Sequence, residues 1–164
     1  MRRRLRVEAE ALSRLHHDNI VQLYDFVDLR DRCAIVTELV HGRTLRQVMA
    51  EHVDAPMAPL MAVQLMTQVL EAVSHAHAEG CLHRDLKPGN IMVTANNQVK
   101  VLDFGIASLI DSDRLTTTGV TVGTPVYMAP EQLNSMDDLD ARADIYSMGV
   151  TFWELLSGYG SRPP

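Results

Sequence analysis

Four side chains capable of chemistry lie in two short segments of the sequence: Asp85, Lys87, Asn90 and Asp103. Amide and carboxylate oxygens, such as those of Asn90 and Asp103, are the ligands that a hard cation such as Mg²⁺ prefers. Lysine offers a compact positive charge on a flexible stem. Whether these groups can act together depends on the elements that position them.

A predicted β-hairpin brings two of these residues together. Residues Ile91–Thr94 and Val99–Leu102 have the composition of short strands, and the polar turn Ala95–Gln98 separates them. Because a hairpin places its two ends side by side, we expect Asn90 and Asp103 to be neighbours, although they are thirteen positions apart.

Periodic apolar spacing predicts the other elements. The expected helices are one that ends near residues 16–19, a short one that begins near Leu45 after the N-cap Thr44, Pro59–Ala78 closed by Gly80, and Ile145–Leu156 ended by Gly158. The expected strands are Ile20–Phe26 and Ala34–Leu39, and a polar loop is expected over Ile106–Thr124. Strands early and helices later predict an α+β fold.

Composition limits the class of protein. A chain of 164 residues with 46% hydrophobic content can bury one ordinary core. The net charge of -6 argues against a nucleic-acid-binding surface. The apolar runs are too short to span a bilayer, so we expect no membrane segment in this chain.

Cysteine and histidine spacing gives no sign of a metal or disulfide framework. Cys33 and Cys81 lie far apart without a CxxC pattern, which fits a reducing cytoplasm. His75 and His77 are two positions apart, whereas a helical metal pair would be four apart, so we interpret both as ordinary helix residues.

The segment His83–Asn90 (HRDLKPGN), followed by Asp103-Phe104-Gly105, resembles the catalytic loop and DFG motif of protein kinases. Ala129-Pro130-Glu131 resembles the APE motif, and the stretch from Asp140 to Gly149 resembles the start of the buried central helix of the large lobe. The resemblance covers essentially the whole chain. The resemblance is to the catalytic domain of eukaryotic-like, Hanks-type serine/threonine protein kinases. The segment Asp85–Asn90 (DLKPGN) looks like that of bacterial members.

This resemblance implies transfer of the γ-phosphate of ATP with the help of Mg²⁺. In that family pattern Asp85 would orient the substrate hydroxyl or accept its proton. Lys87 would offer its charge to the phosphoryl oxygens, and Asn90 and Asp103 would hold Mg²⁺. The expected catalytic residues are therefore Asp85, Lys87 and Asn90, with Asn90 and Asp103 as the metal ligands.

The same resemblance addresses specificity and control. Lys87, with Thr124 in the stretch before the APE motif, resembles serine/threonine rather than tyrosine kinases. Arg84 next to the catalytic aspartate implies control by phosphorylation of the activation loop, with Thr116 and Thr118 as candidate phosphosites. A Thr-rich loop that is simply solvated is the alternative.

Further positions take roles only through the resemblance. Thr37 resembles the gatekeeper, Glu38 and Val40 would present backbone groups to adenine, and Met92 would form the floor of its pocket. A stacked spine that links the lobes, anchored by Asp144, would comprise Leu12, Leu23, His83 and Phe104. Each spine residue could equally be a plain core residue.

Two features depart from the family pattern. Glu8 matches the glutamate that pairs with the ATP-anchoring lysine, but the only lysines are Lys87 and Lys100, and the first glycine is Gly42. Glu131 lacks the downstream arginine that would pair with it. We therefore expect an incomplete two-lobe kinase fold, truncated at both ends, with 1–40 as the remnant of the small lobe and hinge and 41–164 as the large lobe up to its central helix. Uncovered apolar surface would make such a chain poorly soluble.

Three functions remain open on the sequence. The first is a serine/threonine kinase that acts on protein substrates, with a possible dimer for autophosphorylation and with any membrane tether in a longer protein. The second is a catalytically inactive, pseudokinase-like binding module, because the glycine-rich loop and the ATP-anchoring lysine are absent. The third, a small-molecule phosphotransferase, is disfavoured by Arg84 and the APE motif.

Overall fold

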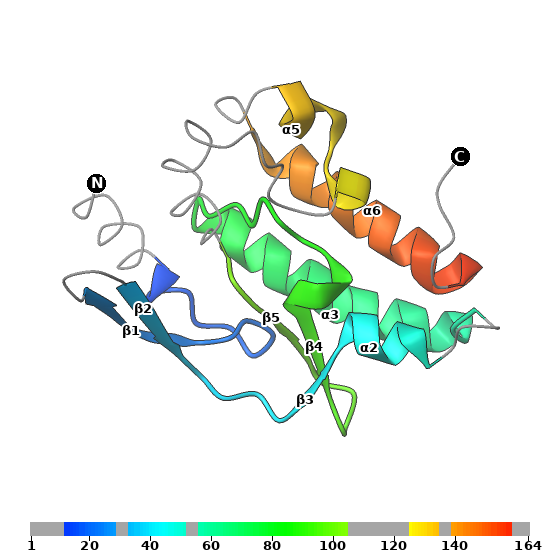
Figure 1. The fold of residues 1–164 in the computed structure, drawn as a ribbon, viewed down its shortest axis with the longest axis horizontal. Coiled ribbons are helices and arrows are strands. Elements are labelled where there is room, and N and C mark those ends of the chain that lie inside the picture. The colour runs from blue at the N-terminus through cyan, green and yellow to red at the C-terminus, as the bar shows by residue number, and fades with distance from the viewer. Residues whose placement is uncertain (1–11, 29–32, 52–55, 105–124, 135–138, 159–164) are drawn as a thin grey trace.

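The computed structural model describes residues 12–28, 33–51, 56–104, 125–134 and 139–158. The described chain combines short strands with helices, as an α+β fold does (Figure 1). In chain order the elements are β1 Leu23–Asp28, β2 Cys33–Thr37, β3 Gly42–Thr44, α2 Leu45–Ala50, α3 Pro59–Ala78, the 3₁₀ turn η1 Pro88–Asn90, β4 Ile91–Thr94, β5 Val99–Val101, the 3₁₀ turn η2 Pro125–Tyr127, α5 Pro130–Asn134 and α6 Ala141–Ser157.

The strands form two separate antiparallel sheets. β1 pairs with β2, and β3, β4 and β5 form a second sheet in that order. β3 lies very close to β4, since a Cβ on Gly42 would stand 2.5 Å from the carbonyl oxygen of Val93. Glycine is the residue that permits this approach. The hairpin β4–β5 agrees with the prediction, with Ile91 opposite Val101.

Helix α3 forms the centre of the core. It lies between the three-stranded sheet and α6, and it contacts both β5 and α6 (Figure 1). Its buried face repeats at helical spacing and includes Leu65, Val69 and Val73, each at most 1% exposed. Gly80, with φ 73°, follows the helix as predicted.

Several element boundaries differ from the sequence predictions. The first helix ends at Leu12 rather than near 16–19, and β1 begins at Leu23 rather than Ile20. Ile20 instead makes an isolated parallel bridge to Val101. Helix α6 begins four residues earlier than predicted, because the Asp140 side chain accepts a hydrogen bond from the Arg142 N–H and caps the helix. The sequence analysis also missed β3, whose three residues are too few to show a period.

An apolar groove with a volume of about 410 Å³ runs between α3 and α6. Its lining residues are Val63, Met66, Thr67, Leu70, Ile145, Met148, Gly149 and Phe152. Among these lining residues, Leu70 at 50% and Ile145 at 57% are exposed. None of the helices in the described ranges combines the length and hydropathy that crossing a bilayer requires.

Candidate active site

The side chains of the catalytic-loop segment converge on the carboxylate of Asp85. Lys87 Nζ lies 2.6 Å from Asp85 Oδ2, and Asn90 Nδ2 donates to the same oxygen at 3.1 Å. Asn90 Nδ2 also donates to the Asp85 carbonyl oxygen at 2.8 Å. The Asp85 side chain keeps 29% of its surface exposed. The geometry therefore fixes one carboxylate oxygen while the group stays open to a reacting molecule.

The His83 ring holds the backbone of Asp85 through a hydrogen bond. Its side chain is fully buried, and Nε2 donates to the Leu102 carbonyl oxygen at 2.8 Å. The other ring nitrogen, Nδ1, accepts a 3.3 Å hydrogen bond from the Asp85 N–H, so the ring is the neutral Nε2–H tautomer. Burial lowers the pKa of His83, and the negative charge of Asp144 opposes that effect only in part.

Asp144, in the first turn of α6, holds the start of the same loop. Its carboxylate accepts hydrogen bonds from the N–H groups of His83 at 2.9 Å and Arg84 at 2.8 Å. Arg84 has φ 67°, in the left-handed region that non-glycine residues rarely adopt. A conformation of this kind persists only where surrounding contacts impose it. Asp144 therefore anchors a strained stretch of backbone immediately before Asp85.

Two further residues contact either Asp144 or the backbone that it anchors, and the sequence analysis missed both contacts. His77 of α3 donates from Nε2 to Asp144 Oδ2 at 2.7 Å, a contact beyond the role of an ordinary helix residue. Gln132 Nε2 donates to the Arg84 carbonyl oxygen at 2.7 Å. No local pattern signals either contact, because the partners are 67 and 48 positions apart in sequence.

The hairpin places Asn90 beside the segment that carries Asp103. The Leu102 N–H donates to the Asn90 carbonyl oxygen at 2.8 Å, which joins the two ends of β4–β5. Because Asn90 Nδ2 faces Asp85, the amide oxygen Oδ1 is left as an acceptor. The Asp103 side chain is exposed. Amide and carboxylate oxygens fit Mg²⁺, which usually binds one or two carboxylates, several waters and substrate phosphates.

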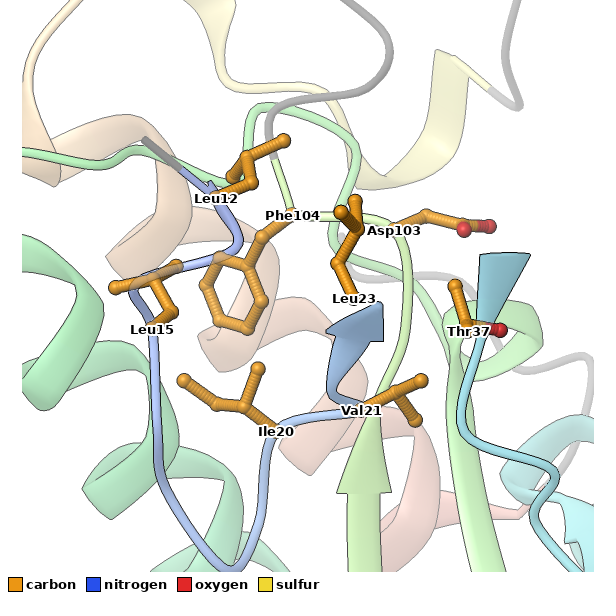
Figure 2. Close-up of a pocket in the computed structure, with 8 residues that line it drawn as sticks. All are labelled: Leu12, Leu15, Ile20, Val21, Leu23, Thr37, Asp103 and Phe104. Carbon is orange, nitrogen blue, oxygen red and sulfur yellow. The ribbon is translucent and has the colours of Figure 1, made fainter. Parts of the chain in front are cut away.

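Asp103 and Phe104 point in opposite directions (Figure 2). Asp103 has φ 57°, again left-handed, and its carboxylate points away from the apolar side chains, while the Phe104 ring points among them. The Phe104 ring lies 4.8 Å from the His83 ring, centroid to centroid. The structure thus brings together the residues proposed as a spine, all at most 8% exposed: Leu12, Leu23, His83 and Phe104. The pocket that Leu12, Leu23 and Phe104 help to line has a volume of about 20 Å³, room for about one water molecule.

The expected adenine-binding segment follows β2. Thr37 is exposed and lines the pocket of Figure 2, while Val40 and Met92 are half-buried. Glu38 Oε2 lies 2.8 Å from Lys100 Nζ on β5, a contact that the sequence analysis missed. Partial burial opposes ionisation of Glu38, but hydrogen bonds from Lys100 and from the Gln22 N–H outweigh it and lower its pKa. This ion pair joins the segment that follows β2 to strand β5 of the other sheet.

For the remaining predicted site residues, the structure gives either no position or only the degree of burial. Glu8, Thr116, Thr118 and Thr124 lie outside the described residues. Glu131 is exposed on α5. Arg84 is half-buried, and its Nε atom is buried without a hydrogen-bond partner among the described residues.

The family described as "Protein kinase domain" matches residues 1–162. Serine/threonine-protein kinase PknB of Mycobacterium leprae is 42% identical over 160 residues, which cover 94% of this chain and 25% of that protein. Serine/threonine-protein kinase PknL of Mycobacterium tuberculosis is 38% identical over 156 residues, which cover 95% of this chain and 38% of that protein. The chain therefore spans about a quarter of the length of the PknB relative.

A solved structure shows the same arrangement of elements. The kinase domain of Mycobacterium tuberculosis PknI superposes with a TM-score of 0.78 and 30% sequence identity. The superposition covers 96% of this chain and 57% of the PknI chain. The α+β fold class expected from the motifs is thereby confirmed.

Proposed function

The chain belongs to the protein kinase family, and on that premise we propose that it transfers the γ-phosphoryl group of ATP to serine and threonine hydroxyls of proteins. The relatives named above are serine/threonine-protein kinases. One observation in this chain carries the proposal: Lys87 and Asn90 both contact a single carboxylate oxygen of Asp85, which stays partly exposed.

In this proposal Asp85 orients the attacking hydroxyl through the carboxylate oxygen that Lys87 and Asn90 do not contact, and it takes up the hydroxyl proton. A bond forms between the hydroxyl oxygen and the γ-phosphorus while the bond from that phosphorus to the leaving oxygen of ADP breaks. Lys87 Nζ, 2.6 Å from Asp85, lies where it can also meet a phosphoryl oxygen. Positioning and charge neutralisation supply most of the catalysis in reactions of this kind.

Asn90 Oδ1 and the Asp103 carboxylate are the proposed ligands of Mg²⁺. When bound, Mg²⁺ would neutralise charge on the phosphates of ATP. The chain's own contribution is to hold its two oxygen donors at adjacent ends of one hairpin, through the 2.8 Å hydrogen bond from Leu102 N–H to Asn90. Glu38, Val40 and Met92 are the proposed contacts to adenine.

The test is a phosphotransfer assay on the full-length gene product with labelled ATP and a generic protein substrate. We expect Asp85→Asn to lower kcat by about 10²- to 10⁴-fold, the range typical for loss of a general base. The matched control is Glu71→Gln, which removes the same charge from an exposed position on α3 and should leave kcat unchanged. Undiminished activity in Asp85→Asn would rule out this assignment.

A second candidate function is a catalytically inactive, nucleotide-binding or scaffolding module. The observation that favours it is that Lys100, the described lysine outside the catalytic-loop segment, is engaged in an ion pair with Glu38. In this arrangement the Lys100 ammonium contacts a carboxylate rather than being held ready for the ATP phosphates. Calorimetric binding of ATP with Mg²⁺, together with no phosphotransfer above the Asp85→Asn background, would favour this candidate.

We also propose control by phosphorylation of the activation loop. Arg84 supports this, because its buried Nε lacks a hydrogen-bond partner among the described residues and a phosphate would supply one. We expect mass spectrometry after incubation with ATP to find phosphate on Thr116 or Thr118. An active preparation with both residues unmodified would refute this control.

The remaining parts of the proposal concern organisation and context. The division into a small-lobe remnant and hinge at 1–40 and a large lobe at 41–164 is supported by the two separate sheets. We propose protein substrates, a reducing cytoplasmic setting and a dimer for autophosphorylation. Dependence of the autophosphorylation rate on protein concentration tests the dimer.

A further inference from the structure

We propose that Gln132 of α5 is a positioning residue for the kinase reaction, because its side-chain amide locks the peptide that precedes Asp85. The inference rests on the proposed function and adds a residue to it. Gln132 is 8% exposed, and its Nε2 donates to the Arg84 carbonyl oxygen at 2.7 Å. Its Oε1 accepts from the Ala129 N–H at 2.9 Å.

The peptide between Arg84 and Asp85 is held at both of its polar atoms. Its carbonyl oxygen accepts from Gln132, and its N–H donates to His83 Nδ1 at 3.3 Å. Because a peptide group is planar, two such contacts fix its rotation. The Cα of Asp85 is bonded directly to this peptide, so the direction of the Asp85 side chain depends on it.

Arg84 also needs a restraint on each side. Its N–H donates to Asp144 Oδ1 at 2.8 Å, and its carbonyl accepts from Gln132. With φ 67°, Arg84 is in a left-handed conformation that is strained for a non-glycine residue. Asp144 comes from α6 and Gln132 from α5, so two helices hold the strained residue from opposite ends of its backbone.

A helix cap is the simpler role for Gln132, and the structure contains it. A glutamine that accepts from a backbone N–H three residues earlier makes one half of a capping box. The contact with Arg84 is additional, since it crosses 48 positions of sequence and uses the amide nitrogen. Only a side chain that both donates and accepts satisfies Ala129 and Arg84 together.

The two substitutions that separate these roles are Gln132→Met and Gln132→Glu. Methionine keeps the approximate length and removes both hydrogen bonds. Glutamate keeps the acceptor for Ala129, but its ionised carboxylate would repel the Arg84 carbonyl oxygen. At low pH the introduced carboxyl group gains a proton, which burial favours, and can then donate to Arg84.

In the full-length gene product, we expect Gln132→Met to lower kcat by about 10- to 100-fold, with KM for ATP changed less than about twofold. Gln132→Glu should lose kcat at pH 8 and recover part of it, relative to the native protein, toward pH 6. Leu133→Ala, at a 61% exposed position of the same helix, is the control and should match the native protein. Thermal unfolding at each pH shows whether a variant with a lowered kcat is still folded, in which case the loss reflects the position of Asp85.

Hydrogen exchange supplies a readout that does not need catalysis. We expect the Asp85 amide to exchange at least about tenfold faster in Gln132→Met than in Leu133→Ala. If the native protein lacks phosphotransfer, the proposed function fails, and the exchange result still decides the role of Gln132. Unchanged Asp85 exchange in folded Gln132→Met, or a kcat within twofold of native, would overturn the inference. If Gln132→Met does not fold, the absence of any low-pH recovery in Gln132→Glu would overturn it.

Discussion

The catalytic-loop segment at residues 83–90 and the region at residues 20–28 and 33–38, which we call the hinge side, both contribute to the candidate site, but they are held in different ways. The first is fixed by buried polar side chains: His83, Gln132 and Asp144 are all at most 8% exposed. The second depends on the Ile20–Val101 bridge and on the partly exposed pair Glu38–Lys100. Its strands also carry exposed apolar residues such as Tyr24, at 63%.

This difference indicates where rigidity is built into the chain. A hydrogen bond in a buried setting is costly to break, because the remaining partner is left without water. A partly exposed ion pair gives little stability, because water and salt compete for both charges. We therefore expect Asp85 to be firmly placed and the hinge residues to move relative to it.

The largest effect is expected from Asp144→Ala. It removes an acceptor from the N–H groups of His83 and Arg84 and from the ring of His77. The free energy of unfolding, measured with urea, should fall by about 3–5 kcal/mol. Asp140→Ala, which removes an exposed cap from the same helix, is the matched control and should cost clearly less. Equal losses in the two variants would break the comparison between buried and exposed anchors.

The second-largest effect is expected in the pH dependence of the free energy of unfolding, and it originates in the buried residue His83. The folded-state pKa of His83 is lowered by burial, so below about pH 6.5 the unfolded chain binds a proton that the folded chain excludes. Stability from this residue is complete above the unfolded pKa and is lost as the pH falls through 6.5 toward the folded pKa. Urea unfolding between pH 8 and pH 5 measures this slope. His83→Phe should flatten it, and an unchanged slope would assign the dependence to other groups.

The smallest effect is expected on the hinge side. A double-mutant cycle with Glu38→Gln and Lys100→Met should give a coupling energy of about 0.2–1 kcal/mol, because both side chains keep some exposure. Added salt should reduce this coupling further. A coupling as large as the loss in Asp144→Ala would show that the two regions are held alike.

Much of the fold was predictable, because long amphipathic helices and a short hairpin have local signatures. The repeat of Met66, Val69 and Val73 predicted α3, and the turn after Thr94 predicted the hairpin that joins Asn90 to the Asp103 segment. Boundaries were less predictable where a cap or a bridge decides them. Asp140 extends α6, and Ile20 pairs with Val101 outside any regular strand.

The sequence by itself determined the family, since its motifs place Asp85, Lys87, Asn90 and Asp103 in the order of the protein kinase pattern. Only the tertiary structure decided how these residues are held. His77, Gln132 and the pair Glu38–Lys100 act on partners 48 to 67 positions away, so no local spacing could reveal them. The physical reason is that side-chain types record local preference and chemistry, whereas hydrogen bonds between distant segments exist only after packing has brought those segments together.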